Sequence, residues 1–486
     1  MTSVSETEST LDDTAQLKKM GYEQELHRHM GGFSNFAISF SIICILAGGI
    51  SAFPQALGAG GGASVGIGWL VGGLFATIVA LAMAQIASSY PTAGGLYHWG
   101  SILGGKGFGW CTAWFNLLGL IFVVASVDYG VYDPFFKTLI EPLLGVDIGP
   151  TPFIASIMAI QAILIYRFPK FTTKITDISG YMIFVLAVAL TVSLLAYNQN
   201  GLDFSRLFTF TNFTGAEGSV WPRNEGVIFP FLSGLLLTVY TITGFDASAH
   251  TSEETKDAAK TVPKGIVSSV VYSAIFGYIM ICTFVLVMPD LAEGVKQGMG
   301  FFESLLTSLP PGLRIALGIG IFIVNFLCGL ACLTSCSRMM YAFARDGGLP
   351  ASNFLRTVNP TLKTPVAAVW VSAILAMSAT LYGDAFVVLS TGCAVFLYLS
   401  YAMPIAAGIL AEGKTWTHKG PFNLGGASKL IAGLAVLGGA FLVFVGVQPP
   451  NEKVLYLIIA MLIVMAVFWF VFGESKRFKG PPSVKE

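Results

Sequence analysis

Charged residues are scarce in this sequence of 486 residues. Asp, Glu, Lys and Arg make up 11% of the chain, and 54% of its residues are hydrophobic. An ordinary soluble domain is roughly 25% charged, so this composition excludes a soluble globular protein and indicates one that lies in a lipid bilayer. The charges also balance, with 27 basic and 27 acidic residues. A polyanionic partner such as a nucleic acid is therefore not indicated.

The sequence also lacks the patterns of secretion, disulfide bonding and catalysis. The first 30 residues are polar and contain no charged-then-apolar signal pattern, so the first apolar run is expected to remain as a helix. All seven cysteines lie in apolar runs, which argues against a disulfide framework. The five histidines show no metal-ligand spacing with Glu and no nucleophile-and-base arrangement. We therefore expect neither an intramembrane enzyme nor a cofactor.

Long apolar runs are abundant. A run of about 20 residues is long enough to cross a bilayer as a helix. We therefore predict an all-α integral membrane protein with twelve transmembrane helices and polar tails at 1–33 and 473–486. The predicted spans are 34–57, 66–89, 107–132, 152–168, 177–197, 227–250, 264–289, 311–342, 365–383, 386–411, 428–447 and 452–472.

The basic residues indicate how these spans are oriented. If the N-terminus is cytoplasmic, all but six of the 27 Lys and Arg residues fall in cytoplasmic segments. Such a bias is the usual signature of membrane topology, and it would disappear if one span were miscounted. We therefore expect a multi-pass protein of the cell membrane, plasma or inner, with both termini in the cytoplasm.

The sixth run is interrupted in its middle. Residues 239–250 read VYTITGFDASAH, where Thr243 and Gly244 weaken a helix, and Asp246 and His250 place polar groups where hydrocarbon should continue. An unpaired backbone group in lipid costs several kcal/mol. A break at this depth is therefore expected only where it lines a protein cavity or holds a ligand.

The first run is weakened at a comparable depth. Residues 47–51 are small, and Pro54 follows closely. Gly and Pro cost roughly 1 and 3 kcal/mol inside a helix. The two weak points lie five spans apart, in the first and the sixth, and an odd repeat length inverts the second copy across the membrane. We therefore predict a transporter core at 34–411 made of inverted repeats, 34–197 and 227–411, with two accessory helices at 428–472.

Four strings resemble a known family. They are GYEQELHR (21–28), PTAGGLYHW (91–99), TGFDASAHTSEETKDAAKTVPKGI (243–266) and YAFARDGGLP (341–350). They are similar to the amino acid/choline permeases of the amino acid–polyamine–organocation superfamily, and they occur in that family's order. The resemblance extends from about Gly21 to the twelfth span. It implies the five-plus-five inverted-repeat (LeuT-like) fold, with substrate held between the broken helices 1 and 6.

The resemblance also implies a substrate site. The backbone amides of Gly48, Gly49 and Ile50 would receive a substrate carboxylate, because the start of a helix presents free N–H groups and a positive dipole end. Tyr240 matches the family's aromatic gate, and Asp246 keeps a titratable carboxyl near the site. The backbone carbonyls expected to take the substrate ammonium are those of Ile45, Tyr240 and Thr243.

The coupling ion stays open between sodium and protons. Thr334 and Ser335 match the hydroxyl pair of sodium-coupled members of this fold, which would hold sodium together with the carbonyls of Ile42 and Ile45. Proton-coupled relatives often carry a Lys in the fifth helix, and 177–197 contains none. Many relatives also have Glu where this chain has Gln85. Family precedent nevertheless leans toward protons or exchange.

We expect a secondary active transporter, not an enzyme, that moves an amino acid or 4-aminobutyrate by alternating access. A choline or polyamine carrier is the nearest alternative, because aromatic faces or carboxylates could bind such a cation. A sensor that binds substrate without carrying it is another. Asp128 is expected to line an outer water-filled vestibule rather than to anchor the substrate. The charges of Glu253 and Glu254 are either a solvated surface or an ion-paired gate.

Overall fold

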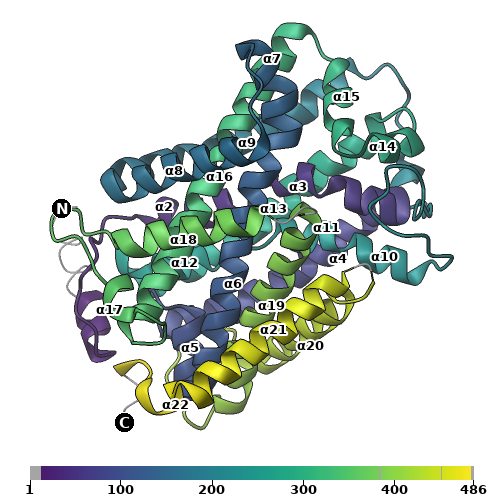
Figure 1. Cartoon of the computed structure of the whole chain (residues 1–486). Helices are drawn as coiled ribbons and strands as arrows, with labels where there is room; N and C mark the ends of the chain where they lie inside the picture. Colours follow the sequence, from purple (N-terminus) through teal and green to yellow (C-terminus); the bar gives the residue numbers. More distant parts are fainter. Residues whose placement is uncertain (1–12, 382–384, 450, 483–486) are drawn as a thin grey trace, which may run out of the picture.

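The computed structural model describes residues 13–381, 385–449 and 451–482. Within these ranges the chain is a bundle of helices without a β-strand, as predicted (Figure 1). Ten of these helices are long and apolar enough to cross a membrane, and the shorter apolar helices Ile228–Thr241 and Val366–Thr380 complete the twelve predicted spans. Parts of three predicted segments lie outside the described residues: 1–12, 382–383 and 483–486.

Most of the spans are single helices. They are α6 (Lys106–Val131), α8 (Pro150–Arg167), α9 (Pro169–Tyr197), α13 (Ala258–Val287), α16 (Pro311–Arg345), α18 (Val366–Thr380), α19 (Ala385–Ala411), α20 (Ser428–Gly446) and α21 (Glu452–Ala466). Several of them begin with Pro at the first position, where its missing N–H has no helical partner to lose. Shorter elements connect the spans: α5 (Leu96–Gly104), η1 (Tyr132–Ile140), α7 (Glu141–Leu144), η2 (Phe204–Leu207), η3 (Ser252–Glu254), α14 (Leu291–Gln297), η4 (Gly298–Gly300), α15 (Phe301–Thr307), α17 (Ser352–Leu355), η5 (Gly425–Ala427), η6 (Val467–Val471) and α22 (Glu474–Arg477).

The first span is broken, as predicted, but at a slightly different place. α2 (Gly32–Ile43) ends where Cys44 takes a φ of 25°, and α3 (Gly48–Ser51) begins after the non-helical residues 44–47. The sequence placed the weak point at 47–51. The small residues of that patch instead form the start of the short helix, because a helix end tolerates Gly better than a helix interior does. α4 (Phe53–Ser89) follows and bends at Gly60 and Gly61.

The sixth span is broken where the sequence predicted. α10 (Ile228–Gly234) and α11 (Leu236–Thr241) precede a non-helical segment at 242–246, and α12 (Ala247–His250) follows it. Gly244 has a φ of 78°, which an L side chain rarely adopts. This conformation is why Gly occupies the middle of the break.

The two broken spans contact each other at the centre of the bundle. α11 packs against α3, and α12 packs against α2. α2 is also in contact with α9, α13 and α16. Each broken span is the first of a group of five spans. This is the five-plus-five inverted-repeat arrangement predicted from the sequence. α20 and α21, yellow in Figure 1, lie at the edge of the bundle against α19.

The two described ends of the chain lie on the same face. The ring of Tyr22 packs edge-on against His98 of α5, with centroids 5.5 Å apart. The Lys106 ammonium, just after α5, donates to the carbonyl of Ser475 at 3.1 Å. We call this the terminal face. A chain whose two ends lie on the same side of a membrane crosses it an even number of times, so this face agrees with the twelve predicted spans.

The loop before α10 covers the opposite face. Trp221 is buried and donates from its indole N–H to the Gln55 carbonyl at 2.6 Å. A Cβ at Gly62 or Gly66 would overlap the backbone of Arg206 or Leu207. The glycines near the start of α4 therefore allow the backbone of this loop to lie directly against the helix.

The outward surfaces of the bundle are apolar. Ile178, Val185 and Val192 of α9 are 52%, 66% and 58% exposed, and Leu430 and Leu437 of α20 are 67% and 71% exposed. Exposed aliphatic side chains on the flanks of long helices are what a lipid-facing surface requires. The chain is a multi-pass membrane protein.

Candidate functional site

The breaks of the first and sixth spans face each other at close range. A Cβ at Gly48 would lie 3.0 Å from both the Cα and the Oγ1 of Thr241. A Cβ at Gly244 would overlap the Cγ2 of Ile42. Both glycines thus allow the backbone of one broken helix to approach the other. The sequence predicted this pairing from the positions of the glycines.

The predicted carboxylate site is only partly free in this conformation. The amide of Gly48 donates to the Cys44 carbonyl at 3.1 Å, and that of Gly49 donates to the Ile45 carbonyl at 3.0 Å. Among the described residues, no acceptor is recorded for the Ile50 amide. In this conformation the amides of Gly48 and Gly49 are therefore not free, because the chain bridges the gap at 44–47 with its own hydrogen bonds. That they receive a substrate carboxylate stays a prediction.

Two of the three carbonyls predicted to take an ammonium group also have partners. The Tyr240 carbonyl accepts from the Thr243 hydroxyl at 2.8 Å, and the Ile45 carbonyl accepts from Gly49. A carbonyl oxygen has two lone pairs, so each can accept one more donor. The Tyr240 hydroxyl donates to Ser126 of α6 at 3.0 Å, and its ring packs edge-on against Phe386. Tyr240 is buried between the two broken spans and α6.

Asp246 lies at the end of the break, where it accepts from two donors and contacts a histidine. Its side chain is 0% exposed. Tyr401 of α19 donates to Oδ1 at 2.8 Å, and Asn116 of α6 donates to Oδ2 at 2.9 Å. The imidazole Nε2 of His250 lies 3.1 Å from the same Oδ2. The Tyr401 hydroxyl also accepts from the Gly244 amide at 3.0 Å, so it ties the carboxyl to the break.

Of the four residues of the predicted cation site, Thr334 lies apart from the other three in one respect. Thr334 lines a small pocket of about 20 Å³ near the terminal face, together with Ser34 and Ile38 of α2, but Ser335, Ile42 and Ile45 do not line it. The Thr334 hydroxyl donates to the Leu330 carbonyl within its own helix, and the Ile42 carbonyl accepts from the Cys328 thiol. The buried Ser335 hydroxyl has no partner among the described residues.

Asp128 does not line an open vestibule. It is fully buried, and its Oδ1 accepts from the Gln161 amide of α8 at 2.8 Å. A Cβ at Gly329 of α16 would overlap this Oδ1. The expectation was wrong because the distance of Asp128 from mid-membrane indicated depth only, whereas the packing of α8 and α16 over α6 decides exposure.

An ion pair closes the terminal face beside the sixth span. Glu253 is 0% exposed, and its carboxylate receives two hydrogen bonds of 3.0 Å from the Arg345 guanidinium. Its Oε1 also accepts from the Ala93 amide at 3.1 Å. Burial alone would raise the pKa of Glu253, but the charge and hydrogen bonds of Arg345, with the Ala93 amide, lower it below 4.5.

The same arginine is enclosed by aromatic side chains from distant segments. The guanidinium of Arg345 lies 4.0 Å from the ring centroid of Tyr22. The hydroxyls of Tyr22 and Tyr97 donate to Asp346 Oδ2 at 2.7 Å and 2.9 Å. Burial raises the pKa of Asp346, although these bonds and Arg345 oppose the rise. All four strings that carry the family resemblance therefore meet in this network.

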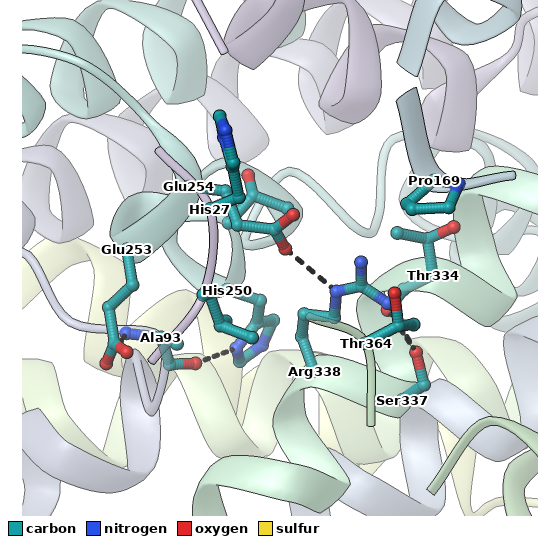
Figure 2. Close-up of polar contacts among 12 residues, drawn as sticks. His27, Ala93, Pro169, His250, Glu253, Glu254, Thr334, Ser337, Arg338 and Thr364 are labelled. Carbon is teal, nitrogen blue, oxygen red and sulfur yellow. Dashed lines mark hydrogen bonds and ion pairs between the residues drawn. The ribbon is translucent and has the colours of Figure 1, made fainter. Parts of the chain in front are cut away.

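A second ion pair lies next to the first. Figure 2 shows Glu254 paired with Arg338 of α16, with an Nε to Oε1 distance of 2.8 Å and both side chains nearly buried. The peptide amides of His29 and Met30 donate to the Glu254 carbonyl at 2.9 Å and 2.8 Å. Glu253 and Glu254 are buried in ion pairs, so the solvated surface is wrong, and the gate stays a prediction.

The N-terminal segment packs against residues 252–258, which follow the sixth span and include Glu253 and Glu254 of the two ion pairs. Asp13 accepts hydrogen bonds from the amides of Asp257 and Ala258 at 2.7 Å and 3.0 Å, which caps the start of α13. Arg28 donates to the carbonyls of Ser252 and Thr255. The sequence predicted only a polar tail here. The signal that could have located this packing is the string GYEQELHR, whose Tyr and Arg are the residues that dock.

A family model and several known proteins match this chain. Residues 30–469 match the family model described as "Amino acid permease". The chain is 32% identical to amino-acid permease BAT1 of Arabidopsis thaliana over 96% of both chains, and 33% identical to the BAT1 homolog of Oryza sativa subsp. japonica over 96% of this chain and 95% of the relative. It is 29% identical to the GABA-specific permease of Saccharomyces cerevisiae, over 91% of this chain and 80% of the relative. The protein with these paired broken helices belongs to the amino acid permease family.

Proposed function

We propose that this chain is a secondary active transporter that carries an amino acid or 4-aminobutyrate across a cell membrane by alternating access. The observation that carries the proposal is the contact between the two broken spans, Gly48 against Thr241 and Gly244 against Ile42. Opposed breaks at the centre of a bundle are where transporters of this architecture bind substrate. The printed names of the relatives, amino-acid permease and GABA-specific permease, support the same class of substrate.

In this proposal the terminal face is cytoplasmic and is closed in the conformation described. The Glu253–Arg345 and Glu254–Arg338 pairs hold the segment after the sixth span against α16. Opening of these pairs would release a substrate bound between the breaks. The transporter core would comprise residues 34–411, with repeats 34–197 and 227–411. The accessory helices at 428–472 would lie outside this core, and both tails would be in the cytoplasm.

Substrate binding requires the breaks to loosen. We expect the carboxylate to take the amides of Gly48, Gly49 and Ile50 in exchange for the hydrogen bonds that bridge 44–47. The ammonium is expected to donate hydrogen bonds to the second lone pairs of the carbonyls named for it: those of Ile45, Tyr240 and Thr243. A choline or polyamine carrier is the less favoured alternative, because the Asp246 carboxylate that such a cation needs is already in contact with Asn116, Tyr401 and His250.

Two measurements test the proposal. A thermal-shift screen of the purified chain against amino acids, 4-aminobutyrate, choline and polyamines, with and without sodium, identifies the ligand, because binding raises the apparent stability. Counterflow of the radiolabelled ligand into proteoliposomes then separates a carrier from a sensor. Binding without counterflow would show a sensor and overturn the proposal.

A matched pair of glycine variants tests the site. Gly48→Leu should abolish counterflow, since its side chain must enter space occupied by Thr241. Gly433→Leu in α20 is the control, because nothing lies within 4 Å of a Cβ there. Both variants should reach the membrane in similar amounts. Normal transport by Gly48→Leu would contradict the site.

A further inference from the structure

Asp246 and His250 form a pair that is sealed from solvent. Both side chains are 0% exposed, and they lie one helical turn apart, at the break and at the end of α12. Nε2 of His250 is 3.1 Å from Oδ2 of Asp246. On the other side of the ring, Nδ1 is 3.1 Å from the Ala93 carbonyl (Figure 2).

These contacts determine how many protons the pair holds. A carbonyl oxygen can only accept, so Nδ1 must carry a hydrogen. If the imidazole is neutral, Nε2 then directs its lone pair at Asp246. This lone pair would repel a carboxylate oxygen at that position. The contact is favourable only when one further proton lies between Nε2 and Oδ2, on the imidazolium or on the carboxylic acid. The closed conformation therefore binds one proton more than a neutral histidine beside a carboxylate.

We propose that the Asp246–His250 pair is the site that binds the coupling proton of this transporter, an inference that rests on the proposed function. The proton is taken up when the pair closes and leaves to water when the His250–Ala93 contact opens. The remaining acceptor sites of Asp246 are served by Asn116 and Tyr401. These neutral donors keep the carboxyl in place in either protonation state.

The pair is mechanically linked to both moving parts. Tyr401 joins Asp246 to the amide of Gly244 in the break. Ala93 accepts from His250 with its carbonyl and donates to Glu253 with its amide. Loss of the proton therefore weakens the contact that holds the Ala93 segment, while Glu253 and Arg345 hold the same segment from the terminal face.

Few other ionisable groups face the pair. Tyr401 and Cys393 approach it from α19, and the Glu253–Arg345 pair lies beyond Ala93. α16 also packs against α12, and its Arg338 and Arg345 are paired with Glu254 and Glu253. The contacts that the remaining helices make with this segment are neutral. They come from Asn116 on α6, Asn35 and Ser39 on α2, Gly265 on α13 and Gly95 at the start of α5. The proton is thus bound by His250 and Asp246 themselves.

Asp128 is the other buried carboxyl of the spans that could carry a proton. Its partner is the amide of Gln161, which cannot titrate, and it contacts neither the break at 242–246 nor the Ala93 segment. A proton on Asp128 would have no described route to influence either moving part. The structure therefore favours Asp246 and His250.

The test compares two modes of transport in proteoliposomes containing the full chain, with radiolabelled 4-aminobutyrate, glutamate, alanine and arginine as probes. Counterflow exchange measures carriage without a net proton movement. Uptake driven by an imposed pH difference measures proton coupling, and trapped pyranine reports the proton that enters. For one proton per substrate, a difference of one pH unit should give about tenfold accumulation.

We expect the wild type to show both modes, whereas His250→Gln retains counterflow and loses accumulation, with the ratio falling to about 1 and the pyranine signal disappearing. Asp246→Asn should lose accumulation as well. His418→Gln, which removes an exposed histidine, should behave as the wild type. Accumulation that persists in His250→Gln, or that is lost in Asp128→Asn but not in Asp246→Asn, would overturn the proposal. Wild-type counterflow without any proton movement would also overturn it and leave the proposed function standing. Absence of counterflow with every probe would overturn both.

Discussion

Removal of Arg345 should open the terminal face. Arg345→Met keeps most of the side-chain length but leaves the carboxylate of Glu253 buried, 0% exposed, without its cation. The two 3.0 Å hydrogen bonds between them are lost, and only the Ala93 amide still donates to Glu253. The closed arrangement of this segment is therefore expected to lose most of its stabilisation.

The magnitude follows from the burial of the pair. Breaking a buried ion pair by removing one partner costs about 3–5 kcal/mol, because the remaining charge is left without compensation. Since about 1.4 kcal/mol corresponds to a factor of ten, the equilibrium between closed and open forms of the segment should shift by roughly 10² to 10³ toward the open form.

Hydrogen exchange of residues 90–99, measured by mass spectrometry, reads this shift directly. The Ala93 amide is protected by the Glu253 carboxylate, so its exchange reports opening of the segment. We expect exchange in this peptide to accelerate by about two to three orders of magnitude in Arg345→Met.

Lys260→Met is the matched control on the same face. Its partner is Asp257, and the two side chains are 59% and 46% exposed. Exposed pairs contribute about 0–1 kcal/mol, so exchange at 90–99 should change less than about fivefold. If Arg345→Met accelerated exchange no more than Lys260→Met does, the ion pair would not be what holds the gate closed.

Three further outcomes are expected. Gly244→Ala should destabilise the closed fold by about 2–4 kcal/mol and abolish counterflow, since its φ of 78° and its approach to Ile42 both exclude a Cβ. Asp13→Ala should cost about 1 kcal/mol and speed exchange at the start of α13, because the capped amide of Ala258 loses its acceptor. The lowered pKa of Glu253 should keep its contribution to the unfolding temperature intact above pH 4.5, and that contribution should be lost as the pH falls through the lower folded value.

Each outcome has its own check. Gly298→Ala also places alanine at a positive φ, 53°, but nothing lies near its Cβ, so its cost should be smaller than at Gly244. Asp13→Asn retains an acceptor oxygen and should exchange like the wild type. For the pH effect, the difference in unfolding temperature between wild type and Glu253→Gln should shrink below pH 4.5. A difference that stayed constant down to pH 3 would contradict the assigned pKa.

The sequence was sufficient for the fold because the bilayer imposes simple rules. Twelve apolar runs gave twelve spans, and Gly244 marked a break that the structure contains. Gly48 was also significant, although the gap precedes it at 44–47. Local hydrogen bonding decides whether residues 47–51 form the gap or the short helix after it, because small residues can adopt both.

The site was predicted less completely, because contacts between distant segments do not follow from spacing. Asp246 was identified as a titratable group near the break, but its bonds to Asn116 and Tyr401 come from two other spans. The burial of Asp128 was missed for the same reason. The role of Ala93 could not have been inferred at all, since nothing in its side chain indicates a polar function.

Ala93 has a consequence for how this protein can change over time. The link between the proton pair and the gate runs through the main chain of a residue whose methyl group takes no part in either hydrogen bond. Substitution of that side chain cannot delete the link unless it displaces the loop. Selection would thus act on the conformation of the turn. Position 93 could change among small amino acids while the two main-chain hydrogen bonds to His250 and Glu253 were retained.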